Sequence, residues 1–532
     1  RRANGSMAVA GPRSGLREIS VAELRKHDKP GDLWLAVSGL VYNVSVFADL
    51  HPGGAKVLEA VAGHDVTEEF YELHRAEVLT RPGRERLVVG RLVGDTAEPA
   101  SVGALSDIPY AEIAALQWQN SPYFKESHRK LQQAVRAFVD TELVQVANAN
   151  DLSGAYPDRE MLQKLGQFGL NACRLGPGPW MDDVEAMGMK LPGGVAPSEF
   201  DYFHEMICHM EMSRLGRPGF IDSLGAGMMI SVPAIYNFGT DAMKEKIGRR
   251  ALLGDVNSAL AISEPFAGSD VARIRTTAVK TPDGRHYIVN GVKKWITEGC
   301  YSDFFVTAVR TGTDGAGGIT MLLIERDDGV ETSQIKTTYS TCPGTALVVF
   351  DNVKVPVENV LGRENDGFKL IMYNFNHERW MIVQMVVGQA RAAVTDAFLW
   401  AKQRKIFGKT LIEQPVIRAK LAAAIAALES VQAYNETLTY DMCVAKDGPL
   451  GRRLAGPIAM LKYQSTRMGW QVADETVQIL GGRGVTKTGM GARVEGFKNY
   501  IKFAAVYGGS EEIMADLAVK QALRTFSGSA KL

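Results

Sequence analysis

The sequence predicts a multidomain protein, in which a small α+β unit is followed by a larger part built from helices, then strands, then helices. Two observations favour this architecture. The apolar residues change between a strand-like and a helix-like period along the chain, and a polar stretch without any period interrupts them. A chain of 532 residues that is 46% apolar can also bury several cores. We expect segments at residues 15–94, 95–105, 106–254, 255–361, 362–526 and 527–532.

The composition narrows the possible functions. Basic and acidic residues number 60 each, which disfavours a nucleic-acid surface and a polybasic membrane anchor. No apolar run approaches the roughly 18 residues that a membrane-spanning helix needs. The five cysteines lie far apart without a Cys-x-x-Cys pair. We therefore expect no disulfide framework, no zinc site and a reducing compartment.

The first segment, residues 15–94, combines strands with amphipathic helices, and residues 33–44 alternate like a hairpin. The loop His51-Pro-Gly-Gly54 has glycines that let the backbone pass close to a large planar ligand, and His74 follows a short polar stretch. Two histidines on opposite walls could hold one iron from both sides. The alternative is that His51 caps a turn and His74 lies on a helix surface.

The residues around these histidines resemble the sequence of the cytochrome b5 haem-binding domain. The resemblance implies that His51 and His74 are the axial ligands of haem b, whereas His64 is expected to face solvent. Because the protein would fill both axial positions, the iron would have no site for oxygen and would transfer single electrons. The matching residues are His51-Pro-Gly-Gly54, Gly63, Asp65, Thr67, Phe70 and His74.

Residues 95–105 are rich in Asp, Thr, Ala, Glu, Pro, Ser and Gly, which is typical of a linker. The apolar spacing of residues 106–254 then predicts helices, and residues 255–361 alternate as strands. Turn signals lie at Asp283-Gly284 and Asn290-Gly291, and the second predicts a hairpin within residues 287–297. Long helices return over residues 362–526. No Gly-x-Gly-x-x-Gly follows a predicted strand, so a nicotinamide dinucleotide site is not indicated.

Two short stretches of the strand-rich segment have residues suited to binding a ligand. In Ala261–Asp270, small residues after a proline leave main-chain groups open to a ligand that must come close. In Trp295–Gly299, an aromatic ring, a hydroxyl and a glycine end an alternating run. Each stretch by itself could be an ordinary strand end with a tight turn.

Together, Ser-Glu-Pro-Phe-Ala-Gly-Ser-Asp at 263–270 and Trp-Ile-Thr at 295–297 closely resemble the flavin-contacting strands of the acyl-CoA dehydrogenases. The resemblance covers residues 106–525 and implies a helices–β–helices fold, FAD as cofactor and an acyl-CoA substrate. It places Ile262 and Ser263 at the flavin edge and Ser269 near the flavin or the thioester. Trp295 and Thr297 are expected to cover the flavin ring.

Two further motifs resemble the family segments that hold the adenosine diphosphate part of the flavin across a subunit boundary. They imply a homodimer or homotetramer. A guanidinium suits a pyrophosphate, and glycine lets the backbone approach it. Where the family segment usually has a further glutamine, this chain has Pro415, and its glutamine, Gln414, lies one residue earlier. The implied contacts are Arg404, Phe407, Gln478, Gly482 and, near the pyrophosphate, Ser510.

The general base of this family usually follows a tyrosine near the C-terminus, but here Tyr507 is followed by Gly508. The long-chain and isovaleryl members instead place the base on an earlier helix, just ahead of an arginine, and Glu378-Arg379 matches that placement. We therefore expect Glu378 to be the catalytic base. Glu511 and Glu512 are rivals, and an ion-paired or solvated Glu378 is the alternative without function.

The sequence thus predicts an FAD-dependent acyl-CoA dehydrogenase that forms 2,3-enoyl-CoA and passes electrons to its own haem. An acyl-CoA oxidase and a non-catalytic flavin-binding protein of the same fold are the alternatives. Gly508 disfavours nitroalkane oxidation, which uses an aspartate at that turn. The tail Ala530-Lys531-Leu532 fits the address read by a peroxisomal import receptor, so we expect a peroxisomal protein.

Overall fold

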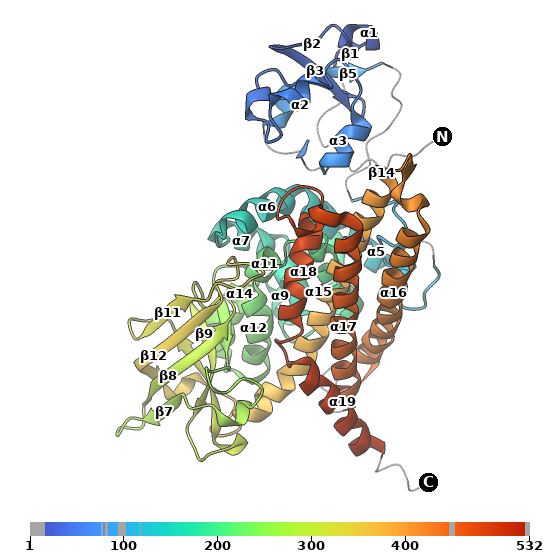
Figure 1. Cartoon of the computed structure of the whole chain (residues 1–532). Helices are drawn as coiled ribbons and strands as arrows, with labels where there is room; N and C mark the ends of the chain where they lie inside the picture. Colours follow the sequence, from blue (N-terminus) through green and yellow to red (C-terminus); the bar gives the residue numbers. More distant parts are fainter. Residues whose placement is uncertain are drawn as a thin grey trace.

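The computed structural model describes residues 16–75, 78–79, 83–93, 103–117, 119–445 and 453–526. Most of the expected linker at 95–105, and the whole tail at 527–532 with its expected import signal, lie outside the described residues. Figure 1 shows a small N-terminal unit next to a larger body, in which a β-sheet flanks a bundle of helices. The predicted fold class is confirmed.

The N-terminal unit is a sheet with strand order β1-β5-β4-β3-β2, packed against short helices. The predicted hairpin is formed by β3 and β4, whose apolar side chains, including Leu33, Leu35 and Tyr42, are buried in its core. This core positions the two loops that carry His51 and His74. The elements are β1 (Glu18–Ile19), α1 (Val21–Leu24), β2 (Asp28–Lys29), β3 (Asp32–Val37), β4 (Leu40–Asn43), α2 (Ala55–Glu59), α3 (Thr67–Leu73) and β5 (Val88–Leu92).

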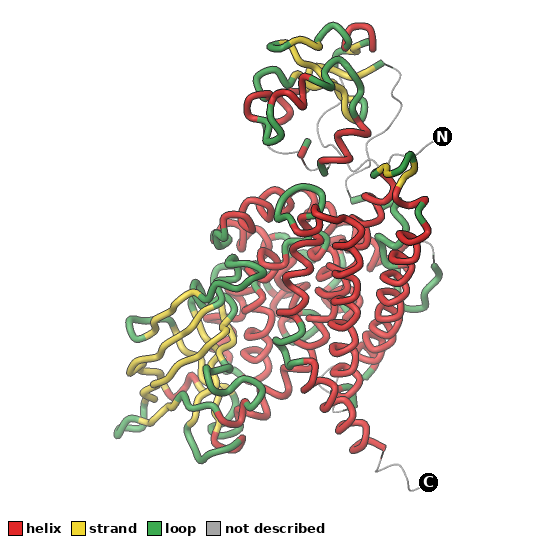
Figure 2. Tube along the Cα trace, viewed as in Figure 1, coloured by secondary structure: helices red, strands yellow, loops and turns green. Residues whose placement is uncertain are grey.

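Helices form the next part of the chain (Figure 2). Residues Pro218–Phe238 are long and apolar enough to cross a membrane, but 83% of their most apolar window is buried inside the protein, as in a core helix. The helices are α4 (Ala114–Gln117), α5 (Glu126–Phe138), α6 (Val144–Ser153), α7 (Arg159–Gln167), α8 (Leu170–Leu175), α9 (Trp180–Ala186), α10 (Tyr202–Ser213), α11 (Pro218–Ser223), α12 (Ala226–Phe238), α13 (Asp241–Met243) and α14 (Arg250–Leu252).

The β part is one sheet with strand order β11-β12-β8-β7-β9-β10-β13, and β6 pairs with β9 in parallel. Its apolar side chains form a core of their own. The strands are β6 (Ser258–Ala261), β7 (Thr277–Lys280), β8 (His286–Ile296), β9 (Phe304–Arg310), β10 (Ile319–Glu325), β11 (Val330–Gln334), β12 (Ala346–Pro356) and β13 (Val360–Leu361).

The prediction of a hairpin turn at Asn290-Gly291 was wrong. Strand β8 runs through both residues, and the register between β8 and β12 shifts beside them, as in a β-bulge. Gly291 has φ +152°, and a Cβ there would lie 2.5 Å from Thr276 Oγ1. The glycine therefore permits a close approach between β8 and Thr276, the residue ahead of β7, instead of a chain reversal. The β7–β8 connection contains Gly284 at φ +70°.

The C-terminal part is a helical bundle around α15, which packs against α10, α16, α17 and α18. A long stretch of α15, from Glu378 to Ala397, is buried almost without interruption. Its side chains are therefore fixed from several sides, which makes it a rigid support for a reactive group. The elements are α15 (Gly367–Gln403), β14 (Lys405–Ile406), β15 (Lys409–Thr410), α16 (Pro415–Val444), α17 (Ala455–Leu480), α18 (Ala492–Ala504) and α19 (Glu511–Phe526).

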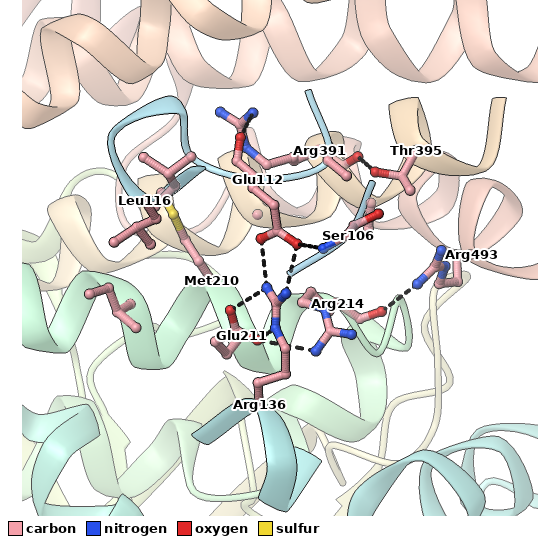
Figure 3. Close-up of a pocket in the computed structure, with 15 residues that line it drawn as sticks. Ser106, Glu112, Leu116, Arg136, Met210, Glu211, Arg214, Arg391, Thr395 and Arg493 are labelled. Carbon is pink, nitrogen blue, oxygen red and sulfur yellow. Dashed lines mark hydrogen bonds and ion pairs between the residues drawn. The ribbon is translucent and has the colours of Figure 1, made fainter. Parts of the chain in front are cut away.

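A buried ion-pair cluster joins α5 and α10 to the segment ahead of α4 (Figure 3). Arg136 donates to both carboxylate oxygens of Glu112 at 2.6 Å, and to Glu211 at 2.7 and 2.9 Å. Its side chain is only 2% exposed. Because water cannot replace these partners, the cluster fixes the geometry of the helices beneath it.

We predict that Arg136→Met destabilises the helical part, because two carboxylates would stay buried without their cation. Removing one partner of a buried pair costs about 3–5 kcal/mol, which corresponds here to a fall of roughly 10 °C in the thermal unfolding midpoint. Lys520→Met is the matched control, since Lys520 and Asp516 form an exposed pair, and such pairs contribute about 0–1 kcal/mol. Equal midpoints for both variants would contradict the prediction.

Candidate active site

Glu378 lies on the buried stretch of α15 and is only 8% exposed. Among the described residues, its Oε2 atom has no hydrogen-bond partner. Burial raises the pKa of the Glu378 carboxyl to about 7, against the lowering effect of Arg379, Lys462 and His377. The side chain is therefore shielded from water. Near neutral pH, a large fraction of the protein molecules carry Glu378 as a carboxylate that can accept a proton.

Gly508 faces this carboxyl. A Cβ placed on Gly508 would lie 3.7 Å from Glu378 Oε1 and 2.4 Å from Ile382 Cδ1, and the residue has φ +64°. A side chain at position 508 would thus be strained and would meet the groups already present. Position 508, where the sequence pattern of the family usually places its base, and Glu378 on α15 therefore face the same small region.

Two cations hold the Tyr507–Gly509 turn in place. Arg379 Nε donates to Gly508 O at 3.1 Å, and Lys462 Nζ donates to Tyr507 O at 2.8 Å. Burial, followed by the Arg379 charge, lowers the pKa of Lys462 to about 7. Both basic side chains therefore bind backbone carbonyls, and both lie close enough to Glu378 to lower the pKa of its carboxyl.

His377, next to Glu378 on α15, forms an ion pair with a residue of α10. Its Nε2 lies 2.8 Å from Glu205 Oε1 and 3.0 Å from Oε2, and Glu205 is fully buried on α10. Burial opposes the charge of His377, but the Glu205 carboxylate raises the pKa of the imidazole above its usual value. The resulting buried ion pair ties α15 to α10 next to Glu378.

The two rival carboxylates, those of Glu511 and Glu512, are either hydrogen-bonded or exposed to solvent. Glu511 Oε1 accepts a 2.8 Å hydrogen bond from Thr466 Oγ1, and its other oxygen lies 3.5 Å from Arg467. Glu512 is exposed in the first turn of α19. Of the three candidates, Glu378 alone combines a buried carboxyl with an oxygen that lacks a hydrogen-bond partner among the described residues.

The structure brings the two predicted flavin motifs side by side. Lys294 N donates to Ser263 O at 2.9 Å, which ties the segment after β6 to the end of β8. Ile262 is buried and Ser263 is half-buried beside it, whereas Ser269 is exposed. Trp295 is 53% exposed at φ +68°, with Thr297 half-buried two residues later. An open indole and nearby main-chain groups fit a flat ring system such as the flavin.

Sequence reasoning missed the ion pair beneath these motifs. Glu264 Oε1 accepts from Lys293 Nζ at 2.8 Å and from Thr276 N at 2.9 Å, while its Oε2 accepts from Arg275 N at 2.6 Å. Lys293 Nζ also donates to Ile262 O at 3.0 Å. A glutamate before a proline and a lysine at an inward-facing strand position were the available signals. The pair fixes the backbone on which the flavin edge would rest.

Three of the residues expected to hold the adenosine end of the flavin are exposed on a single chain. Phe407 is 96% exposed between β14 and β15, and Gln478 and Gly482 are exposed at the end of α17. Arg404 and Arg483 both lie against the Trp400 ring, which places the end of α15 beside the turn after α17. Ser510 is half-buried just ahead of α19.

The rings of His51 and His74 lie opposite each other, with 5.9 Å between centroids and an interplanar angle of 51°. Two metal–nitrogen bonds of about 2 Å, the usual length for histidine ligands, fit between them. His51 Nδ1 donates to Gly54 O at 3.3 Å, and His74 Nδ1 donates to Phe70 O at 3.2 Å. These bonds fix the tautomers whose Nε2 atoms carry the lone pairs that a metal needs. The pair fits a haem iron, and His64 is exposed as expected.

A second group of possible metal ligands, His128, Asp201 and His204, does not suit a metal. Each Nδ1 atom accepts a backbone N–H, from Lys125 at 2.7 Å for His128 and from Asp201 at 3.1 Å for His204. The ring proton of His128 therefore sits on Nε2, which donates to Asp201 Oδ1 at 2.9 Å, and His204 Nδ1 lies 2.8 Å from the same carboxylate oxygen. The group caps the starts of α5 and α10.

Comparisons with known proteins identify the domains of this chain. Family models match for the acyl-CoA dehydrogenase middle domain at residues 259–353, the acyl-CoA dehydrogenase C-terminal domain at 365–523 and the cytochrome b5-like heme/steroid binding domain at 20–105. The acyl-CoA dehydrogenase apdG of Emericella nidulans is 39% identical over 431 residues, which is 80% of this chain and 98% of that protein.

The acyl-CoA dehydrogenase AFT10-1 of Alternaria alternata is 35% identical over 78% of this chain and 96% of its own length. A solved structure of a probable acyl-CoA dehydrogenase from Mycobacterium abscessus superposes with a TM-score of 0.66 at 30% identity. It covers 75% of this chain and 100% of that one. The chain therefore belongs to the acyl-CoA dehydrogenase family of oxidoreductases and carries an N-terminal cytochrome b5-like domain.

Proposed function

We propose that this chain binds FAD, oxidises a saturated acyl-CoA to its 2,3-enoyl form, and passes the electrons to a haem b in its own N-terminal domain. The observation that carries the proposal is the buried Glu378 carboxyl opposite Gly508, with its pKa raised to about 7. A carboxyl in that state is suited to take the proton from the C2 carbon of a thioester.

The reaction removes a proton from C2 and a hydride from C3 of the acyl group. FAD, when bound, supplies the hydride acceptor. Glu378 takes the proton on Oε2, while Arg379 and Lys462 hold the turn that closes the site from the opposite side. Trp295, Ser263 and Thr297 are the residues that support the flavin ring in this proposal, because the Lys294–Ser263 bond gathers their segments.

The same proposal includes a homodimer or homotetramer. Phe407, Gln478 and Gly482 are exposed on a single chain although their motifs resemble flavin contacts. A partner subunit would cover them and complete the adenosine end of the site.

We predict that Glu378→Gln lowers the rate of flavin reduction by acyl-CoA about 10²–10⁴-fold, because the amide cannot accept the C2 proton. Stopped-flow measurement of the flavin band in the variant, loaded with FAD, reads this step directly. Glu512→Gln serves as the control, since that carboxylate is exposed on α19, and it should reduce flavin at the unmodified rate. An undiminished rate in Glu378→Gln would rule out this base.

The rate should also depend on pH through the same carboxyl. Burial raises the pKa of Glu378, so the active carboxylate form is lost as pH falls through about 7. We expect kcat/KM to fall tenfold per pH unit well below this value and to level off above it. A flat profile between pH 5 and pH 8 would contradict the assignment.

The haem part of the proposal rests on two facing histidines and on the covalent link between the two domains, which raises the effective concentration of the acceptor. Each turnover releases two electrons and one haem holds one, so a one-electron acceptor outside the chain must reoxidise the iron twice.

Without oxygen, acyl-CoA should first bleach the flavin and then convert ferric to ferrous haem in the unmodified protein. His51→Ala should keep the flavin bleaching and lose the haem signal, whereas exposed His64→Ala should keep both. Flavin bleaching without haem reduction in haem-loaded protein would refute the transfer. Fast peroxide formation in air would then favour an acyl-CoA oxidase.

A further inference from the structure

One arginine of the haem-binding unit reaches into the dehydrogenase body. Arg75 donates from Nη1 to Asp396 Oδ2 at 2.5 Å and from Nη2 to Asp396 Oδ1 at 3.0 Å. Its Nη1 also donates to the backbone oxygen of Met490 at 3.2 Å. The side chain is only 13% exposed, so the guanidinium is largely removed from water by the two domains together.

Asp396 receives this arginine together with a second one. Arg493 of α18 donates to both carboxylate oxygens, with a 2.9 Å bond from Nε to Oδ2, and its Nη1 donates to Arg214 O at 2.9 Å. Burial opposes the charge of Asp396, but Arg493 and Arg75 hold the pKa of its carboxyl below the usual value. The carboxylate is thus ionised and bridges two guanidinium groups from different parts of the chain.

The triad has the properties of a contact that can open. Breaking a buried ion pair is costly when it leaves a charge without a partner. Here Asp396 keeps Arg493 when the N-terminal unit moves away, and Arg75 gains water. The cost of separation is therefore smaller than for an isolated buried pair, while the paired forks still specify one orientation.

The position of the triad relates it to the haem site. Arg75 directly follows the expected ligand His74, and α3, which ends at Leu73, contacts α15. Figure 1 shows α3 as the helix of the N-terminal unit that lies next to the helical body. Asp396 is on α15, the helix that also carries Glu378. Docking through Arg75 therefore turns the face of the unit that carries His74 toward the dehydrogenase body.

We propose that the Arg75–Asp396–Arg493 triad is a reversible latch that docks the haem-binding unit on α15 and α18 in the orientation used for electron transfer. Arg75 is in this sense a positioning residue. The role in electron transfer rests on the proposed function, whereas the docking itself does not.

The test compares full-length protein with Arg75→Gln and with Arg25→Gln, the same change at an exposed residue that directly follows α1. Figure 1 shows α1 at the end of the unit that faces away from the helical body. Small-angle X-ray scattering and hydrogen exchange of the α3 and α18 amides report docking without any turnover. Stopped-flow absorption in the absence of oxygen reports flavin bleaching and haem reduction separately. The haem absorption band shows whether the unit remains folded.

For Arg75→Gln we expect a larger radius of gyration, faster exchange at α3 and α18, unchanged flavin bleaching and haem reduction slowed about tenfold. Arg75→Lys keeps the charge but loses the paired fork, so it should recover docking in part. Arg25→Gln should match the unmodified protein in every readout.

Scattering and exchange that are the same for Arg75→Gln and the unmodified protein would overturn the latch. Altered docking with unchanged haem reduction would overturn its role in orientation. If the unmodified protein bleaches its flavin and never reduces haem, while Arg75→Gln still expands, the electron route fails and the latch stands.

Discussion

A carboxyl buried on α15 without a full set of hydrogen bonds is the constraint on which the rest of the site depends. Placing Glu378 away from water disfavours its charge, and the protein keeps it there because α15 is held by the neighbouring helices along its length. A surface helix could not impose this environment. The cost of burying the group is therefore linked directly to its reactivity, since the same burial moves the pKa of the carboxyl toward the pH at which it must work.

The surrounding charges limit this effect without cancelling it. Arg379 and Lys462 are close enough to lower the pKa of Glu378, but both donate to the backbone of the Tyr507–Gly509 turn. The positive charges thus lower the pKa of the Glu378 carboxyl, but neither forms a direct ion pair with it that would keep it ionised. In the β part, Glu264 and Lys293 fix the strand ends in a similar way, through one buried pair that holds backbone groups. In both places a buried charged side chain holds main-chain atoms in fixed positions.

Much of the architecture follows from local sequence. Apolar periods were sufficient to predict the order of helices and strands, because each period reflects one buried face, and the fold class and family are confirmed. The prediction of a turn at Asn290-Gly291 failed because β8 runs straight through the dipeptide, the extra residue lies opposite on β12, and the glycine is needed only for its close neighbour Thr276. The opposition of Glu378 and Gly508, and the contact between Arg75 and Asp396, join residues far apart in sequence, so no local pattern could reveal their geometry. The roles of the individual flavin-contacting residues stay predictions.

The most direct test of the account is hydrogen exchange at the substrate itself. A saturated acyl-CoA incubated in D2O with the flavin-loaded protein, without an electron acceptor, is analysed by mass spectrometry for deuterium at C2. If Glu378 is the base, the unmodified protein should exchange the C2 proton and Glu378→Gln should not, although both bind the thioester. Equal deuterium uptake by the two proteins would show that another group removes the proton, and would contradict the central claim.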